Sequence, residues 1–190
     1  MPEWLEKLDR DLLLAINGNH TPFWDQVMWT ANEELTWLPL YIFAGLIILY
    51  HYGRKGIIMI ILAAGLFFVS DQLASNLLRP RIERVRPSHE PGLSEMLHYV
   101  NNYRGEGYSF VSSIATIVFS LAFYFYFTLA KARWLLLLIF PWAFLLAISR
   151  IYLGVHYPTD IIAAVLIGLL IGWLGNRLYF WILKKFKPLL

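Results

Sequence analysis

Five apolar segments divide this chain, and short polar connections separate them. They cover residues 35–50, 56–78, 110–129, 134–149 and 161–183. An α-helix needs about 20 apolar residues to cross the hydrocarbon core of a bilayer, so each segment is long enough, or nearly so, to span a membrane. The first and fourth are short and need flanking aromatic residues such as Trp37 and Trp134 at the interface. The pattern predicts one all-α domain over residues 1–190, a polytopic transmembrane bundle of about five helices.

Residues 1–31 carry a different, amphipathic pattern. Apolar side chains from Trp4 to Ile16 recur at helical spacing, and Thr21-Pro22 is typical of the start of a second helix. The polar break at residues 17–20 argues against a sixth span. We expect two helices lying in the outer membrane interface. The first residues lack a basic flank followed by an apolar run, so we expect no cleavable signal peptide.

Composition agrees with a membrane protein and excludes some chemistry. The chain is 58% hydrophobic and only 15% charged, which is unusual for a soluble domain of 190 residues. It has no cysteine, so a disulfide framework and a zinc–thiolate site are impossible. The net charge of +3 is small, and we expect no nucleic-acid partner.

The positions of the basic residues predict the orientation. The segments 51–55, 131–133 and 184–187 are basic and fall on one side if five spans alternate. The positive-inside rule makes that side cytoplasmic. The opposite, extracytoplasmic side then carries the loop 79–109 and the turn 150–160. We therefore expect a multi-pass protein of the inner (cytoplasmic) membrane with its polar loops facing the periplasm.

Polar clusters from three different helix ends meet on that outer side. Each has an ordinary explanation alone, because arginines contact lipid headgroups, serines cap helices and a lone histidine is usually a surface residue. Their combination on one face favours a functional site. The clusters are Arg79 with Arg86-Pro87, then Ser112-Ser113, and finally Ser149-Arg150 with His156 and Asp160.

The chemistry of these side chains points to phosphate. Three arginines offer planar, permanently charged groups that suit phosphoryl oxygens: they are Arg79, Arg86 and Arg150. Ser112 and Ser113 open a helix, whose free N–H groups favour an anion. Asp160 could hold one ring nitrogen of His156 and leave the other free to attack. Such a site needs no metal or other cofactor.

These motifs resemble those of the type 2 phosphatidic acid phosphatase (PAP2) family of integral membrane phosphatases. The family's first motif is Lys, six residues, then Arg-Pro, and here arginine replaces the lysine. The third motif is Ser-Arg, five residues, His, three residues, Asp, and it is matched in full. The matching residues are Arg79, Arg86 and Pro87 for the first motif and Ser149, Arg150, His156 and Asp160 for the third.

The resemblance covers most of the chain and implies roles for these residues. His156 would be the nucleophile that forms a phosphohistidine, Asp160 would orient it, and the arginines, Arg150 among them, would clamp the phosphate. The implied partners are the membrane and a lipid phosphate such as phosphatidic acid, phosphatidylglycerophosphate, undecaprenyl diphosphate or lipid A.

The second motif departs from the family. The family pattern Pro-Ser-Gly-His reads Val111-Ser112-Ser113-Ile114 here. In the family that histidine protonates the departing alkoxide, and isoleucine cannot. A positioned general acid contributes about 10²–10⁴-fold, so we expect turnover to be reduced by about that factor. A diphosphate substrate would suffer less, since phosphate is a better leaving group.

Several alternatives remain open from the sequence. The chain could be a naturally impaired relative, an engineered inactive variant, or a pseudophosphatase that binds lipid phosphates without hydrolysing them. His89 or His98 could replace the missing acid, which we consider the less favoured reading. Asp71, inside the second span, is a functional candidate by its depth, but we favour a structural pairing with an arginine. A transporter is disfavoured because the chain has neither repeat symmetry nor interrupted spans.

Overall fold

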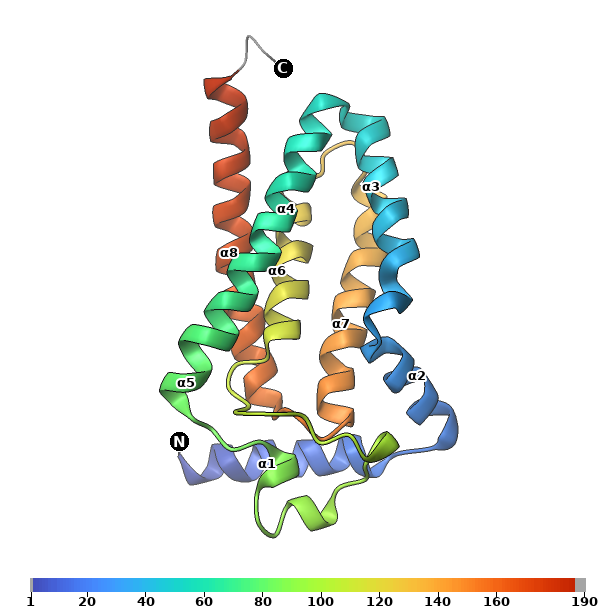
Figure 1. Cartoon of the computed structure of the whole chain (residues 1–190), viewed down its shortest axis with the longest axis vertical. Helices are drawn as coiled ribbons and strands as arrows, with labels where there is room; N and C mark the ends of the chain where they lie inside the picture. The colour runs from blue at the N-terminus through green and yellow to red at the C-terminus, as the bar shows by residue number, and fades with distance from the viewer. Residues whose placement is uncertain (1, 187–190) are drawn as a thin grey trace.

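The computed structural model describes residues 2–186, apart from the side chain of Glu34, as a bundle of helices (Figure 1). This part of the chain contains no strand, which confirms the all-α prediction. Its α-helices are α1 (Glu3–Gly18), α2 (Pro22–Asn32), α3 (Leu38–Tyr52), α4 (Arg54–Gln72), α5 (Arg79–Ile82), α6 (Ser113–Thr128), α7 (Leu136–Tyr152) and α8 (Pro158–Lys185). A π-helical turn, Leu73–Leu78, joins α4 to α5.

Four helical stretches are long and apolar enough to cross a membrane. They are Leu35–Tyr52, Arg54–Ile82, Arg133–Tyr152 and Pro158–Lys185. The remaining predicted span, residues 110–129, contains only the 16-residue α6. This helix is about 24 Å long at 1.5 Å per residue. The helix begins later than predicted because Ser112 is extended and caps it. All five predicted helices exist, but α6 falls short of the length of the other four.

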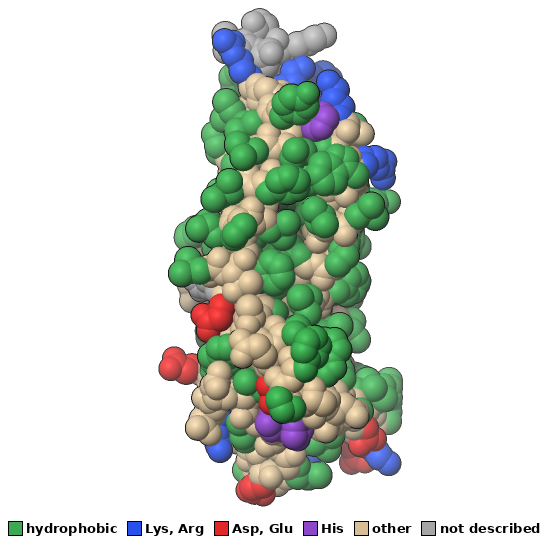
Figure 2. All heavy atoms as spheres, turned by 90° about the vertical axis from the view of Figure 1, so that its right-hand side faces the viewer, with side chains coloured by type: hydrophobic (Ala, Val, Ile, Leu, Met, Phe, Trp, Pro, Cys, Tyr) green, Lys and Arg blue, Asp and Glu red, His purple; other side chains and the backbone are tan. Residues whose placement is uncertain are grey.

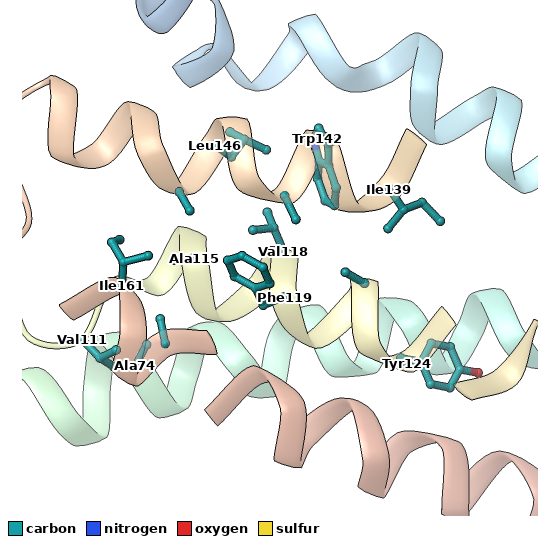
Figure 3. Packing of buried hydrophobic residues seen from close by; sticks show 14 of the residues in the cluster. Ala74, Val111, Ala115, Val118, Phe119, Tyr124, Ile139, Trp142, Leu146 and Ile161 are labelled. Atoms are coloured by element: carbon teal, nitrogen blue, oxygen red, sulfur yellow. The ribbon is translucent and has the colours of Figure 1, made fainter. Parts of the chain in front are cut away.

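Helix α6 lies in the centre of the bundle, and two glycines of α8 allow the close packing between these two helices. A Cβ atom on Gly168 would lie 2.9 Å from the backbone nitrogen of Ser120, and one on Gly172 would lie 2.7 Å from that of Tyr124. Neither distance is sterically tolerable, so both positions require glycine. Figure 3 shows side chains of α6, including Phe119, packed between α7 and α8. This packing fixes the start of α8 beside the start of α6.

The two ends of the bundle differ in chemistry. At the lower end of Figure 1, the end of α5, the start of α6, the end of α7 and the start of α8 come together. The predicted basic segments 51–55 and 131–133 lie at the opposite end with Lys184 and Lys185; residue 187 lies outside the described residues. Figure 2 shows hydrophobic side chains covering the length between these ends. This apolar surface is that of an integral membrane protein.

The two predicted N-terminal helices are present. Thr21 caps α2 by accepting a hydrogen bond from the Trp24 N–H at 3.2 Å, and Pro22 is the first helical residue. Helix α1 lies across the lower end of the bundle and packs against α7 and α8 (Figure 1). The loop that was predicted from residue 79 begins only after α5, because Arg79 still lies in a helix. Helix α1 therefore covers the end where the polar motifs meet, and α2 packs against α7.

Candidate active site

The turn between α7 and α8 places His156 and Asp160 next to each other. Asp160 lies in the first turn of α8, where its Oδ2 accepts a hydrogen bond from the Tyr157 N–H at 3.0 Å as part of a capping box. His156 lies just before the helix and is only 1% exposed. Its Nδ1 is 3.5 Å from the Oδ2 of Asp160, longer than a normal hydrogen bond. A slight rotation of the ring would close this contact.

The environment keeps the imidazole of His156 neutral. Burial is the main cause that lowers the pKa of His156 to about 3; Asp160 opposes this shift, and the nearby charges of Arg150 and Arg86 add to it. At neutral pH the ring therefore carries one proton. The network assigns that proton to Nδ1, facing Asp160, and leaves the lone pair on Nε2. Nε2 lies 3.2 Å from the Nη1 of Arg86. A neutral imidazole with its lone pair on Nε2 can act as a nucleophile once the contact with Arg86 gives way to a phosphoryl group.

Arg86 brings the first motif to the histidine. Its side chain is 4% exposed, and its guanidinium donates hydrogen bonds to the carbonyl oxygens of Val155 at 2.8 Å and Glu106 at 2.9 Å. Burial and the charges of Arg79 and Arg150 lower the pKa of Arg86 to about 10, so the group remains charged at neutral pH. Fixed in this way, Arg86 presents a positive charge to the reactive nitrogen.

The other two arginines approach from different helices. Arg150 is 5% exposed in the last turn of α7; it donates to the Tyr103 hydroxyl at 3.0 Å and to the Asn32 amide oxygen. Its buried Nε has no hydrogen-bond partner among the described residues. Arg79 donates to the Ser113 hydroxyl at 2.9 Å. The mutual repulsion between Arg79, Arg86 and Arg150 shows that their charges lie close together, and an oxyanion bound among them would relieve that repulsion.

The two serines at the start of α6 have different partners. Ser112 is fully buried and caps the helix by accepting from the Ala115 N–H at 3.4 Å, the ordinary role of such a serine. Ser113 instead contacts Arg79.

Ile114 lines a cavity of about 440 Å³ at this end of the bundle. The cavity is also lined by Ser113 and Asn32, the partners of Arg79 and Arg150, and by Asp71. A side chain at position 114 thus faces the space beside the arginines. Asp71 accepts from the Ser75 hydroxyl at 3.1 Å, and its charge also interacts favourably with that of Arg79, in line with the expected structural pairing.

An apolar groove continues from this cavity along the bundle. It has a volume of about 450 Å³ and is lined by residues of α3, α4, α6 and α7. Tyr41, Phe67 and Ile117 line both the groove and the cavity, so the two spaces are contiguous. The polar end of the bundle is therefore connected to an apolar groove that could hold a lipid chain.

Sequence reasoning missed a group of residues that holds Asp160 in place. Arg84 donates to Oδ1 of Asp160 and to Oδ2 of Asp9, each at 2.6 Å. Asp9 in turn accepts from the Thr159 N–H at 2.9 Å. One feature of the sequence could have indicated that Asp9 is buried. It lies one helical turn before the buried Leu13, on the same face of α1.

The two loop histidines have partners of their own. His89 is exposed and lies 3.1 Å from the Ser88 hydroxyl. His98 lies 3.0 Å from the carboxylate of Asp25 and stacks on His20. These contacts do not favour the alternative that either histidine acts as the general acid.

A membrane-embedded bundle that gathers a buried imidazole, its carboxylate and three guanidinium groups at one end has the architecture of an integral membrane phosphatase. Residues 56–184 match the model of the PAP2 superfamily, and the chain belongs to that family. It is a membrane lipid phosphatase of the PAP2 type by this membership.

Relatives and solved structures agree with this assignment. The chain is 38% identical to a lipid A 4'-phosphatase of Bacteroides thetaiotaomicron, over 92% of this chain and 78% of the relative. It is 31% identical to a lipid A 4'-phosphatase of Porphyromonas gingivalis, over 94% and 76%. The crystal structure of Aquifex aeolicus LpxE matches with a TM-score of 0.63 and 25% identity, over 88% of this chain and 93% of that one. The transmembrane PAP2-type phosphatidylglycerolphosphate phosphatase from Bacillus subtilis shares the fold, with a TM-score of 0.65 and 23% identity over 93% and 86%.

Proposed function

We propose that this chain hydrolyses a lipid phosphomonoester or diphosphate through a phosphohistidine on His156, slowly because Ile114 stands in place of the general acid. The observation that carries the proposal is the convergence of a neutral, buried His156 with Arg86 and Arg150, whose partner Asn32 lines a cavity that continues into an apolar groove. The cluster suits a phosphate headgroup, and the groove suits an acyl or isoprenoid chain.

The proposed reaction has two steps. Nε2 of His156 attacks phosphorus while the bond to the lipid oxygen breaks, and Arg79, Arg86 and Arg150 neutralise the charge on the phosphoryl oxygens. Asp160 stabilises the positive charge that develops on the ring. Water then attacks phosphorus, releases inorganic phosphate and returns the imidazole to its neutral form. These groups supply the charge and the nucleophile, so we propose that the reaction needs no metal.

The first step is where Ile114 matters. The departing lipid oxygen needs a proton, and an isoleucine side chain in the cavity has none to give. The proton must come from water, which slows expulsion of an alkoxide by about 10²–10⁴-fold. A diphosphate is less affected, because the group that leaves in the first step is the lipid monophosphate, which departs without prior protonation. A diphosphate lipid is therefore the substrate that this chain would process fastest.

The names of relatives support the substrate class. Lipid A 4'-phosphatases and a phosphatidylglycerophosphatase B from Bacillus subtilis are among them, as is the bacitracin transport permease protein BcrC of Bacillus licheniformis. We propose a lipid phosphate of the lipid A, phosphatidic acid, phosphatidylglycerophosphate or undecaprenyl diphosphate class. By the positive-inside rule, we propose that the site faces the periplasmic side of the inner membrane.

Ile114 also supports a second function, a pseudophosphatase that binds the lipid phosphate and does not release product. The arginine cluster and the groove serve binding equally well, and only the leaving-group chemistry is missing. The two functions differ in phosphate release but not in affinity for the lipid.

Purified protein in detergent, offered each of the four lipids, separates the two functions. We expect Ile114→His to raise release of inorganic phosphate from monoesters by about 10²–10⁴-fold. His156→Ala in the same background should abolish release, and the exposed Arg81→Gln should leave it unchanged. No gain from Ile114→His would refute the general-acid explanation. Lipid binding with no release from any substrate by the unmodified chain would establish the pseudophosphatase.

A further inference from the structure

A second cluster of ligand-type side chains lies at the same end of the molecule, outside the phosphate site. His20 follows α1, Asp25 lies in α2, and His98 lies in the loop between α5 and α6. One ligand atom from each of the three lies within 4.8 Å of the other two. Figure 2 shows histidine side chains together with an acidic side chain at the lower end of this face.

The distances suit a small divalent cation. Zinc bonds to histidine nitrogen and carboxylate oxygen at about 2.0–2.2 Å, so neighbouring ligand atoms in a tetrahedral shell lie about 3.3–3.6 Å apart. Nε2 of His98 and Oδ2 of Asp25 are 3.0 Å apart. The His20 ring stacks on that of His98 with a centroid separation of 3.7 Å and an interplanar angle of 8°. Because His20 is exposed, its ring can tilt until a nitrogen points at the same ion.

Two of the three side chains are already held by a surrounding shell. The Tyr152 hydroxyl donates to Oδ1 of Asp25 at 2.6 Å, which leaves Oδ2 available as a ligand. Asn17 brackets the backbone of His98, accepting from its N–H at 2.9 Å and donating to its carbonyl at 2.9 Å. Such outer contacts orient ligands and tune their affinity in metal sites.

We propose that His20, Asp25 and His98 bind one transition-metal ion, with solvent in the remaining position and Zn²⁺ as the preferred ion. Two imidazoles and one carboxylate form a set that zinc favours, whereas Mg²⁺ and Ca²⁺ prefer oxygen ligands. The ion would tie the α1–α2 connection to the loop that carries Arg86 and Tyr103. The ion would stabilise this connection, and it is separate from the metal-free chemistry proposed for His156.

The test uses full-length, tag-free protein that has been stripped with a chelator and titrated with Zn²⁺ by calorimetry. We expect about one ion per chain. Loss of an outer contact typically weakens metal binding about 10–100-fold, so Tyr152→Phe should fall in that range and His20→Ala or His98→Gln should weaken it by more. His89→Ala is the matched control, an exposed histidine of the same loop, and should bind as the unmodified chain does.

Thermal unfolding provides a second readout. Zn²⁺ should raise the unfolding temperature of the unmodified chain and of His89→Ala, but not that of His20→Ala, because an ion that binds only the folded state stabilises it. His20 is exposed, so this variant should fold normally. Absence of binding by the unmodified chain, or equal binding by His20→Ala and His98→Gln, would overturn the proposal. Neither result would bear on phosphate release, which tests the proposed function separately.

Discussion

Arg84 provides the sharpest test of how the fold positions His156, the proposed nucleophile. It bridges two carboxylates that are almost completely buried, Asp160 at 0% exposure and Asp9 at 1%. Burial alone would lower the pKa of Arg84, but the two carboxylates raise it overall, so the bridge is charged. Replacing Arg84 with methionine keeps an unbranched side chain, shorter and uncharged, and leaves both carboxylates without their cation.

The expected loss of stability follows from these contacts. Breaking a buried ion pair by removing one partner costs about 3–5 kcal/mol. The two pairs share one guanidinium, so their costs do not simply add. Asp160 keeps its hydrogen bond from the Tyr157 N–H, and Asp9 keeps that from the Thr159 N–H. We therefore expect Arg84→Met to reduce the free energy of unfolding by about 3 kcal/mol, the lower end of that range.

A positioning role predicts more than lost stability. Without Arg84, the Asp160 carboxylate can turn away from His156, and formation of labelled phosphohistidine in the Ile114→His background should slow at temperatures where the variant is fully folded. Arg84→Lys should recover part of both effects, since one ammonium can reach only one carboxylate. Arg81→Met is the control for a lost surface arginine. Unchanged unfolding together with unchanged phosphohistidine formation in Arg84→Met would refute the reasoning.

Two further predictions concern the imidazole and the helix packing. His156 has a pKa of about 3 in the folded chain and about 6.5 when unfolded. Below pH 6.5 the unfolded state therefore binds a proton that the folded state does not, and the free energy of unfolding falls by about 1.4 kcal/mol per pH unit. Between pH 7 and pH 5, the free energy of unfolding should fall less for His156→Gln than for the unmodified chain. Equal decreases would contradict a neutral His156 in the folded chain. Gly172→Ala should destabilise by about 1–3 kcal/mol by forcing α6 and α8 apart, whereas Gly65→Ala, whose Cβ would have no neighbour within 4 Å, should not; equal stabilities would show that the close approach is unimportant.

Residues that are close in sequence were the ones whose arrangement could be predicted. His156 and Asp160 are separated by one helical turn, and Pro158 fixes where that turn begins, so their spacing alone places them together. The five apolar helices also follow from the sequence, because bilayer thickness fixes their length. The short α6 shows the limit of that argument: its ends are set by the Ser112 cap and by packing inside the bundle, and neither depends on apolar length.

Contacts between distant segments could not be predicted. Arg84 is one of five arginines between residues 79 and 104. Only the folded chain shows that Arg84, rather than Arg81, reaches Asp160. Asp9 is in a helix with no motif at all. The sequence also assigned Ser112 and Ser113 the same role, while the fold gives one to the helix cap and the other to Arg79. Such choices depend on tertiary geometry.

The phosphate-binding part of the site and its leaving-group part are built differently. Arg86, Arg150 and His156 are each at most 5% exposed and are held by contacts from several segments. Like charges buried close together destabilise the fold unless an anion offsets them. Position 114 instead lines a cavity, so isoleucine can replace histidine there without disturbing those contacts. Under the proposed function, anion binding and product release are therefore separable properties, and only the second depends on the side chain at position 114.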